Sequence, residues 1–207
     1  MSQTSHDFSH SFTDLMTSLA VIFILLLVAT LNDAFSEGAQ AVTDLREAVV
    51  KELTELKLNL TPDPEDPYTQ IINLAEDKVK FQYDKANLSS EGKDLIGQLF
   101  NVLAPALCED KLREKLESVI VEGHTDLQGN NSIKGKLHNV DLSQKRAFAV
   151  LDHAFNVLDK THKKELECLR KIAISVGRGS SKPKQDDDSS RRVEVKIRVK
   201  SGFRGRA

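Results

Sequence analysis

The chain lacks tryptophan, has only two cysteines among its 207 residues, and carries a formal net charge of −2. Nucleic-acid binders usually show basic surfaces with interleaved aromatic residues, and here aromatic residues make up 5% of the chain, so we predict no nucleic-acid partner. Cys108 and Cys168 form no CxxC pair, which removes the usual cysteine-based metal and redox motifs. No nucleophile–base set or metal cluster is visible, so the sequence predicts no enzyme, no catalytic residue, no metal and no cofactor.

Charge is also absent from residues 15–31, LMTSLAVIFILLLVATL. As a helix this run covers about 26 Å, and adding residues 12–14 completes a hydrocarbon core of ~30 Å. We therefore predict a membrane helix at 12–32 after a short cytoplasmic tail at 1–11. A cleaved signal peptide is the alternative, but residues 1–11 lack Lys and Arg and no clean A-x-A site follows.

An acidic residue, Asp14, lies at the start of this predicted helix. Placing an aspartate at the centre of a membrane helix costs roughly 2.5–3.5 kcal/mol, and acids inside membranes commonly serve proton or ion relays. We therefore predict that Asp14 is the ion-translocating residue. The alternative is a plain membrane anchor, in which Asp14 is only its polar flank.

The segment 33–60 is predicted to be an amphipathic helix just outside the membrane. Its apolar residues recur every three or four positions, at Val42, Leu45, Val49, Leu53, Leu56 and Leu60. Such a stripe either packs on its own domain or pairs with a second copy of the chain. The prolines at 62, 64 and 67 cannot continue a helix, so 61–74 is predicted to be a linker.

The remainder, 75–200, is predicted to be one α/β sandwich, with a disordered tail at 201–207. Alternating patterns predict strands at 79–83, 116–122, 172–176 and 192–199. Helices are expected from Ser89 or Ser90 through Leu103, and from Leu142 to about Leu169. Together they indicate a mixed four-stranded sheet with helices on one face.

Three motifs in this region resemble the OmpA-like peptidoglycan-binding domain. They are VEGHTD at 121–126, NVDLSQKRA at 139–147 and RRVEV at 191–195. The resemblance covers about 75–200 and implies that the domain binds the free amine and carboxylate of a peptidoglycan peptide stem, often diaminopimelate.

The resemblance implies a set of binding residues for that ligand. Asp126 at a strand end would hold the ammonium group, and Arg146 would bind the carboxylate with two hydrogen bonds. The start of the second helix would add backbone N–H donors. The expected peptidoglycan-binding set is Thr125, Asp126, Asn139, Leu142, Ser143, Arg146 and Arg192.

Two further features leave alternatives open. His124 is read as a structural residue rather than a metal ligand, because no second ligand stands at helical or hairpin spacing. Cys108 and Cys168 each follow a helix and precede a strand. They are either a disulfide, as an oxidising periplasm would allow, or two unpaired buried cysteines.

The N-terminal segment Phe12–Thr17, FTDLMT, resembles the Y-A-D-F/L-M-T segment of MotB-type stator subunits. That resemblance implies an ion-driven rotary motor in the bacterial inner membrane, single-pass, with a cytoplasmic N-terminus and a periplasmic C-terminal domain. The implied partners are a second copy of this chain, a MotA/ZorA-like multi-span membrane subunit forming a pentameric ring around the dimer, and peptidoglycan. Flagellar B subunits usually carry a basic cytoplasmic tail and a longer periplasmic linker. This chain has neither, which favours the Zorya anti-phage type over a flagellar stator. A passive wall anchor without ion flow is the alternative from another functional class.

Overall fold

The computed structural model describes residues 3–75, 79, 81, 84–184 and 187–201, and divides the chain into two compact units. The first contains the chain up to Ala39, and the second runs from Gln40 to Lys200. Helix α1 (Gln3–Glu55) begins in the first unit and ends in the second. The two helices predicted at 12–32 and 33–60 are therefore one unbroken helix. All but the first residue of the tail predicted at 201–207 lies outside the described residues.

The N-terminal unit contains a helix that is long and apolar enough to cross a membrane. Its side chains between Phe12 and Leu31 are exposed, as expected for a surface that lipid would cover. Two hydroxyls bond back to helix carbonyls: Thr17 Oγ1 donates to Thr13 O at 2.7 Å, and Thr30 Oγ1 donates to Leu27 O at 2.9 Å. These polar groups are satisfied within the helix, which is what a hydrocarbon surrounding requires.

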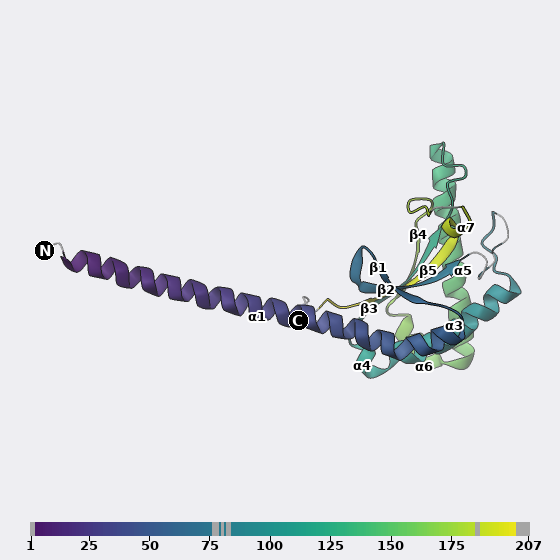
Figure 1. Ribbon diagram of the computed structural model, residues 1–207. Helices are drawn as coiled ribbons and strands as arrows, with labels where there is room; N and C mark the ends of the chain where they lie inside the picture. Colours follow the sequence, from purple (N-terminus) through teal and green to yellow (C-terminus); the bar gives the residue numbers. More distant parts are fainter. Residues whose placement is uncertain (1–2, 76–78, 80, 82–83, 185–186, 202–207) are drawn as a thin grey trace. The chain divides into compact units, whose positions relative to one another are not determined.

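The second unit is built on a five-stranded sheet (Figure 1). The strand order is β1-β2-β5-β3-β4, and β3 and β4 form the parallel pair while the other neighbours are antiparallel. The strands are β1 (Leu60–Asp63), β2 (Asp66–Ala75), β3 (Leu116–His124), β4 (Ala173–Gly177) and β5 (Arg192–Val199). The helices are α3 (Ser90–Cys108), α4 (Asp110–Arg113), α5 (Ile133–Thr161), α6 (Lys163–Leu169) and α7 (Asp187–Ser190).

The predicted α/β class with a mixed sheet is confirmed. Alternate residues of β5, such as Val193 and Val195, pack with α1, α3 and α5 side chains in one apolar core. Their partners across the sheet, among them Ile72 and Val121, lie on the same face. The helices therefore cover one face of the sheet, as predicted.

The predicted linker at 61–74 is wrong, because this segment forms most of the β1–β2 hairpin. Leu60 and Ile72 face each other across it, and both are in the core. Pro62 is tolerated because β1 is an edge strand. On the side of β1 that has no neighbouring strand, the missing N–H of proline removes no hydrogen bond from the sheet. The strand predicted at 79–83 is described only at Val79 and Phe81, outside the five strands; its other residues lie outside the described ones.

The end of α1 packs on its own domain rather than forming a pairing seam. Ala41, Leu45, Val49 and Leu53 are at most 2% exposed and belong to the domain core. Arg46 adds a polar clamp, since its Nη1 donates to Gln70 Oε1 at 2.8 Å. A dimer seam built on these residues is therefore excluded, because their side chains are already buried within one chain.

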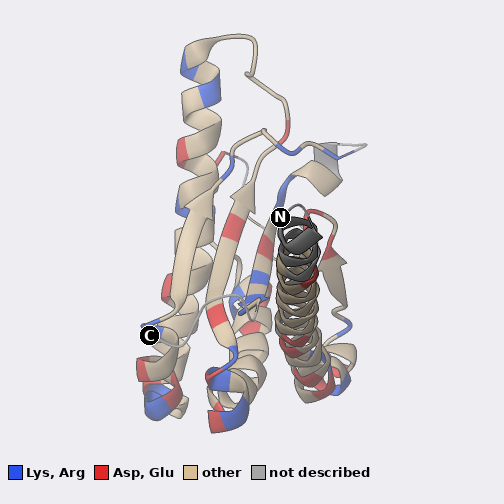
Figure 2. Ribbon diagram, turned by 90° about the vertical axis from the view of Figure 1, so that its left-hand side faces the viewer, with Lys and Arg blue, Asp and Glu red and all other residues tan. Residues whose placement is uncertain are grey.

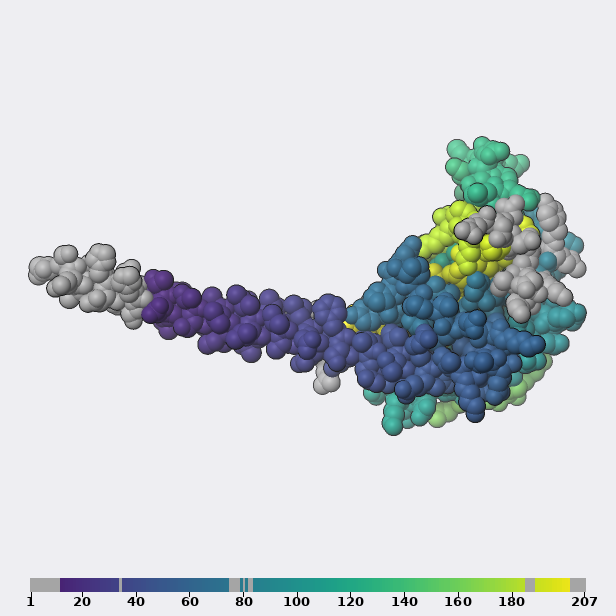
Figure 3. Space-filling model, viewed as in Figure 1, coloured from purple at the N-terminus to yellow at the C-terminus, as the bar shows by residue number. Residues whose placement is uncertain are grey.

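Local helix starts were predicted with mixed success. Ser89 caps α3, accepting a hydrogen bond from Gly92 N at 3.0 Å, as the sequence indicated. By contrast, α5 begins at Ile133, nine residues before Leu142, and is capped by Ser132. The first turns of α5, green in Figure 3, protrude from the domain, and Leu137 is 65% exposed.

Candidate ligand-binding pocket

A pocket of about 280 Å³ lies where β3 ends beside the first half of α5. It contains most of the residues that the OmpA-like motifs nominated, although they come from separate parts of the chain. Its lining residues are Asp84, Thr125, Asp126, Gln128, Gly129, His138, Asn139, Leu142, Arg146 and Arg191.

Asp126 lines this pocket and is held in place by two contacts. Its Oδ1 accepts a hydrogen bond from Gln128 N at 3.0 Å, and its Oδ2 lies 2.8 Å from Arg191 Nη1. The residue is 7% exposed. A largely buried carboxylate needs a cationic partner, so this position selects for positive charge.

Arg146 reaches the pocket from α5 and is 3% exposed. Its Nε donates to Lys85 O at 3.1 Å, and its guanidinium carbon lies 5.0 Å above the centre of the Phe81 ring. Stacking on an aromatic face fixes the plane of the guanidinium. The arrangement suits binding of a planar carboxylate.

Other side chains complete the walls. Asn139 Nδ2 donates to Gln128 O at 2.9 Å and so ties α5 to the preceding loop. His138 Nε2 lies 2.7 Å from Asp84 Oδ1. The Thr125 hydroxyl is buried and has no hydrogen-bond partner among the described residues. An unsatisfied buried hydroxyl beside a pocket is a group that a polar ligand would satisfy.

Two of the nominated residues are not in the pocket. Ser143 is fully buried within α5, donating to Val140 O and accepting from Gly179 N. Because α5 starts earlier, the backbone N–H groups near Leu142 lie inside the helix, and the predicted helix N-terminus at the ligand is wrong. Arg192 is also buried elsewhere, with its Nε 2.6 Å from Glu194 Oε1.

Of the lining residues that the prediction missed, Arg191 is the one that pairs with Asp126. It immediately precedes β5. The Arg-Arg pair in the third motif indicated that an arginine would lie here. It did not indicate which of the two arginines would face the pocket.

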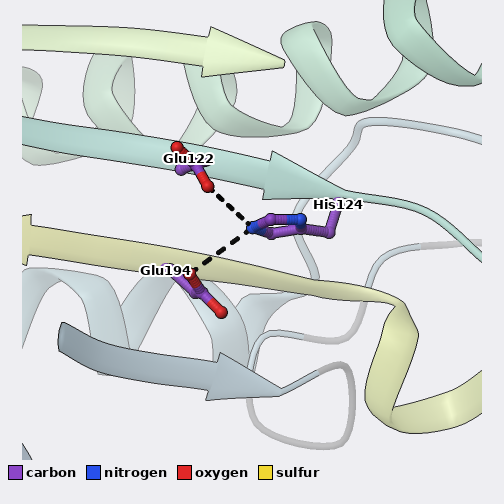
Figure 4. Close-up of side chains that lie close together, drawn as sticks. All are labelled: Glu122, His124 and Glu194. Atoms are coloured by element: carbon purple, nitrogen blue, oxygen red, sulfur yellow. Dashed lines mark ion pairs between the residues drawn. The ribbon is translucent and has the colours of Figure 1, made fainter. Parts of the chain in front are cut away.

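Charged residues lie along the strands of the sheet (Figure 2). Those of β3 and β5 alternate with core residues, so they lie on the sheet face opposite the helices. His124, fully buried, points its Nε2 between Glu122 and Glu194, at 3.2 Å and 3.5 Å from their nearest oxygens (Figure 4). Neither ring nitrogen is aligned for a hydrogen bond with a described residue. The three side chains are close enough together to share a metal ion.

Three cations already neutralise these carboxylates, which makes the cluster a poor metal site. Lys196 Nζ lies 3.0 Å from Glu122 Oε1, Arg178 Nε lies 3.1 Å from Glu122 Oε2, and Arg192 pairs with Glu194. Burial alone would raise the pKa of Glu122, but the His124 ring, Lys196 and Arg178 outweigh it and lower the pKa to about 2. The cluster is a buried ion-pair network, in keeping with a structural His124.

Comparison with solved structures places this fold. A MotB-like protein from Desulfovibrio vulgaris superposes with a TM-score of 0.51 at 14% identity, covering 85% of this chain and 99% of that one. The periplasmic domain of Helicobacter pylori MotB gives a TM-score of 0.50 at 14% identity, covering 69% of this chain and 79% of that one. The second unit of this chain therefore has the fold of these MotB-like structures.

A named relative is found among curated proteins, although no protein-family profile matches the chain. The Zorya protein ZorB of Escherichia coli O139:H28 (strain E24377A / ETEC) is 22% identical over 199 residues, covering 90% of this chain and 78% of ZorB. Because 90% of this chain is aligned, the similarity includes at least part of the apolar N-terminal helix as well as the domain.

Proposed function

We propose that this chain is the B subunit of an ion-driven rotary motor in the bacterial inner membrane, acting in anti-phage defence. The observation that carries the proposal is Asp14, an acid on an apolar helix joined to a domain with the MotB fold. A carboxylate inside a membrane is unfavourable, by roughly 2.5–3.5 kcal/mol at the centre of a helix, so an acid on this helix calls for a function.

Asp14 would carry the ion through a cycle of charge. Helical spacing puts Thr17 and Ser18 on the same face as Asp14, one turn further along. Protonation, or binding of a sodium ion, neutralises the carboxylate so that it can face an apolar surrounding. Release restores a charge that pairs elsewhere. Each elementary charge that crosses the membrane down the potential releases about 2.3 kcal/mol of free energy per 100 mV.

One helix cannot enclose a conducting path, so the proposal requires partners. A MotA/ZorA-like multi-span subunit would supply the rest of the path, as a pentameric ring around two copies of this chain. The two copies would meet through their membrane helices, since the stripe at the end of α1 is buried in the domain core. The charge cycle on Asp14 would then turn the ring stepwise.

The domain would hold the B subunits still against the cell wall. Asp126 and Arg146 lie in one pocket and offer opposite charges to the amine and carboxylate of a peptidoglycan stem. Wall binding requires a periplasmic domain and therefore a cytoplasmic N-terminus. The Cys108–Cys168 disulfide agrees with that placement, because disulfides persist in oxidising compartments.

The test compares two acidic residues at opposite ends of the apolar run, Asp14 and Asp33. Each is changed to Asn in cells carrying the complete gene set, and plaque formation by phage is counted at matched expression. We expect Asp14→Asn to abolish protection and Asp33→Asn to retain it. A passive wall anchor predicts full protection from Asp14→Asn. Unchanged plaque counts together with lost swimming would instead assign the motor to a flagellum.

A further inference from the structure

Helix α5 carries a row of exposed apolar side chains, which we name the α5 stripe. Its members are between 45% and 80% exposed and recur at helical spacing along one face of the helix: Ile133, Leu137, Val140 and Phe148. The other exposed large apolar side chains described in the second unit are scattered, on α1, on β4 and after β3. A continuous apolar row outside the membrane helix marks a contact surface.

Charged side chains flank the stripe in an order that fits a second copy of α5. They are exposed and follow one line along the helix, with alternating sign: Lys134, Asp141, Lys145 and Asp152. In an antiparallel pair of α5 helices whose two-fold axis passes midway between Lys134 and Asp152, each of these two faces the other residue of the second copy. Asp141 then faces Lys145 of the second copy, and every pair occurs twice.

We propose that two copies of this chain pair through the α5 stripe, with the two α5 helices antiparallel. The same axis places Phe148 beside Leu137 of the second copy, so that apolar side chains meet along the middle of the contact. A stable interface usually takes about 20–30 residues from each partner, more than this stripe supplies. Membrane helices that already hold two copies together raise the effective concentration of a second contact to roughly the millimolar range, so a weak contact is sufficient.

Pairing through the stripe leaves the candidate ligand pocket open. His138, Asn139 and Arg146 line that pocket. At about 100° per residue, these three lie on the side of α5 that faces away from the stripe. Two paired copies would therefore present both of their pockets to the cell wall.

The open edge of the sheet next to the stripe is already occupied. Strand β4 is at the edge of the sheet, and Gln144, which lies within the stripe, covers part of it. Gly177 N donates to Gln144 Oε1 at 2.7 Å, and Gln144 Nε2 donates to Ser175 Oγ at 3.1 Å. An edge whose backbone groups are bonded in this way is a poor site for adding a strand, so the pairing uses the helices.

Cysteine crosslinking of the full-length chain in cell membranes tests the contact. Cys108 and Cys168 are bonded to each other, so introduced cysteines supply the free thiols. Leu137→Cys combined with Phe148→Cys places two thiols about 16 Å apart along one helix, too far for a bond within a chain. Across the two-fold axis these positions face each other, so oxidation should produce covalent dimers.

Each single-cysteine variant is the matched control for the double variant. In Leu137→Cys alone, or Phe148→Cys alone, the thiol faces the other position of the second copy and lies far from its own counterpart. Each single variant should therefore form covalent dimers about tenfold more slowly than the double variant.

A charge exchange on the double-cysteine chain tests the flanking pairs. Lys134→Glu sets carboxylates against each other at both ends of the contact, so the rate of crosslinking should fall about fivefold or more. Adding Asp152→Lys restores opposite charges across the axis and should restore the rate. Positions 134 and 152 are about 27 Å apart along α5, so this recovery cannot come from a pair within one chain.

Urea unfolding of the charge variants separates pairing from folding, and should be unchanged because both side chains are exposed. A double-cysteine chain that forms no dimer, single variants that crosslink as fast as the double variant, or a charge exchange that fails to recover the rate would each overturn the α5 pairing. The stripe would then belong to another partner, such as a lipid surface or a different protein. Failure here leaves the role of Asp14 untouched, because plaque counts test that role separately.

Discussion

Cys108 at the end of α3 is bonded to Cys168 in α6, 60 residues further along the chain. The bond joins two helices that cover the same face of the sheet, and it closes a long loop that the unfolded chain would otherwise leave free. Closing a loop of this size lowers the entropy of the unfolded state and stabilises the fold by about 3–4 kcal/mol.

We therefore expect the double variant Cys108→Ser, Cys168→Ser to lose about 3–4 kcal/mol of unfolding free energy, measured by urea titration of the full-length chain. A reducing agent should destabilise the wild type by the same amount and leave the double variant unaffected. If the reducing agent changes nothing in the wild type, the two thiols are not bonded in the protein.

The packing of α1 on the domain predicts a second effect on stability. Leu45 is fully buried in the core, whereas Val50, on the same helix, is 38% exposed. Leu45→Ala should cost about 2–5 kcal/mol, because truncating a buried leucine loses apolar burial and leaves a cavity. Val50→Ala should be close to neutral.

The stability of both variants should be measured by urea unfolding. Their self-association should be measured by crosslinking in the membrane. If the buried stripe were a dimer seam instead, Leu45→Ala would reduce crosslinking while leaving the unfolding of the domain unchanged.

The ion-pair network behind the pocket predicts how stability depends on pH. The pKa of Glu122 falls from 4.5 to about 2 on folding, and that of Glu194 is lowered as well. A lowered carboxyl pKa contributes stability that is fully present above pH 4.5 and is lost as pH falls toward 2. For Glu122 this amounts to about 3 kcal/mol.

Unfolding free energies at pH 7, 4.5 and 3 measure this slope. Glu122→Gln should lower stability at pH 7 and flatten the decline below pH 4.5, because the titrating group is gone. Asp141→Asn is the control, since Asp141 forms only an exposed pair with Lys145. A wild-type profile that is flat from pH 4.5 to 3 would contradict the network.

The strands that could be predicted are those with strict alternation. In β5, Arg192 through Val199 switch between the core and the polar face at each residue, so the pattern is visible without a structure. The β1–β2 hairpin was hidden because prolines usually end strands, and only its position at the sheet edge makes Pro62 acceptable.

The early start of α5 was hidden for a different reason. Ile133 and Leu137 are exposed, so the first turns present no buried stripe for the sequence to display. The choice between Arg191 and Arg192 depended on a single position of register, because neighbouring residues at a strand face opposite directions. The helical spacing of 42–60 was equally compatible with a domain core or a partner helix, so only the tertiary structure could decide.

Two glycines give a matched test of how closely α5 approaches the sheet. A Cβ added at Gly123 in β3 would lie 2.1 Å from Ser143 O, a backbone atom of α5. A Cβ added at Gly97 in α3 would lie 3.6 Å from Val157 Cγ2, an ordinary van der Waals contact. Gly97→Ala should therefore stabilise the protein by about 0.5–1 kcal/mol, the gain from replacing glycine within a helix.

Gly123→Ala should have the opposite effect, because the backbone of α5 must move before a methyl group fits. We expect a loss of more than about 2 kcal/mol in urea unfolding, in the range of overpacked cores. Since Arg146 and Asn139 lie on the same helix as Ser143, the shift should also weaken stem-peptide binding in molecules that remain folded. Equal stability of the two alanine variants would show that β3 and α5 are not in contact at this point.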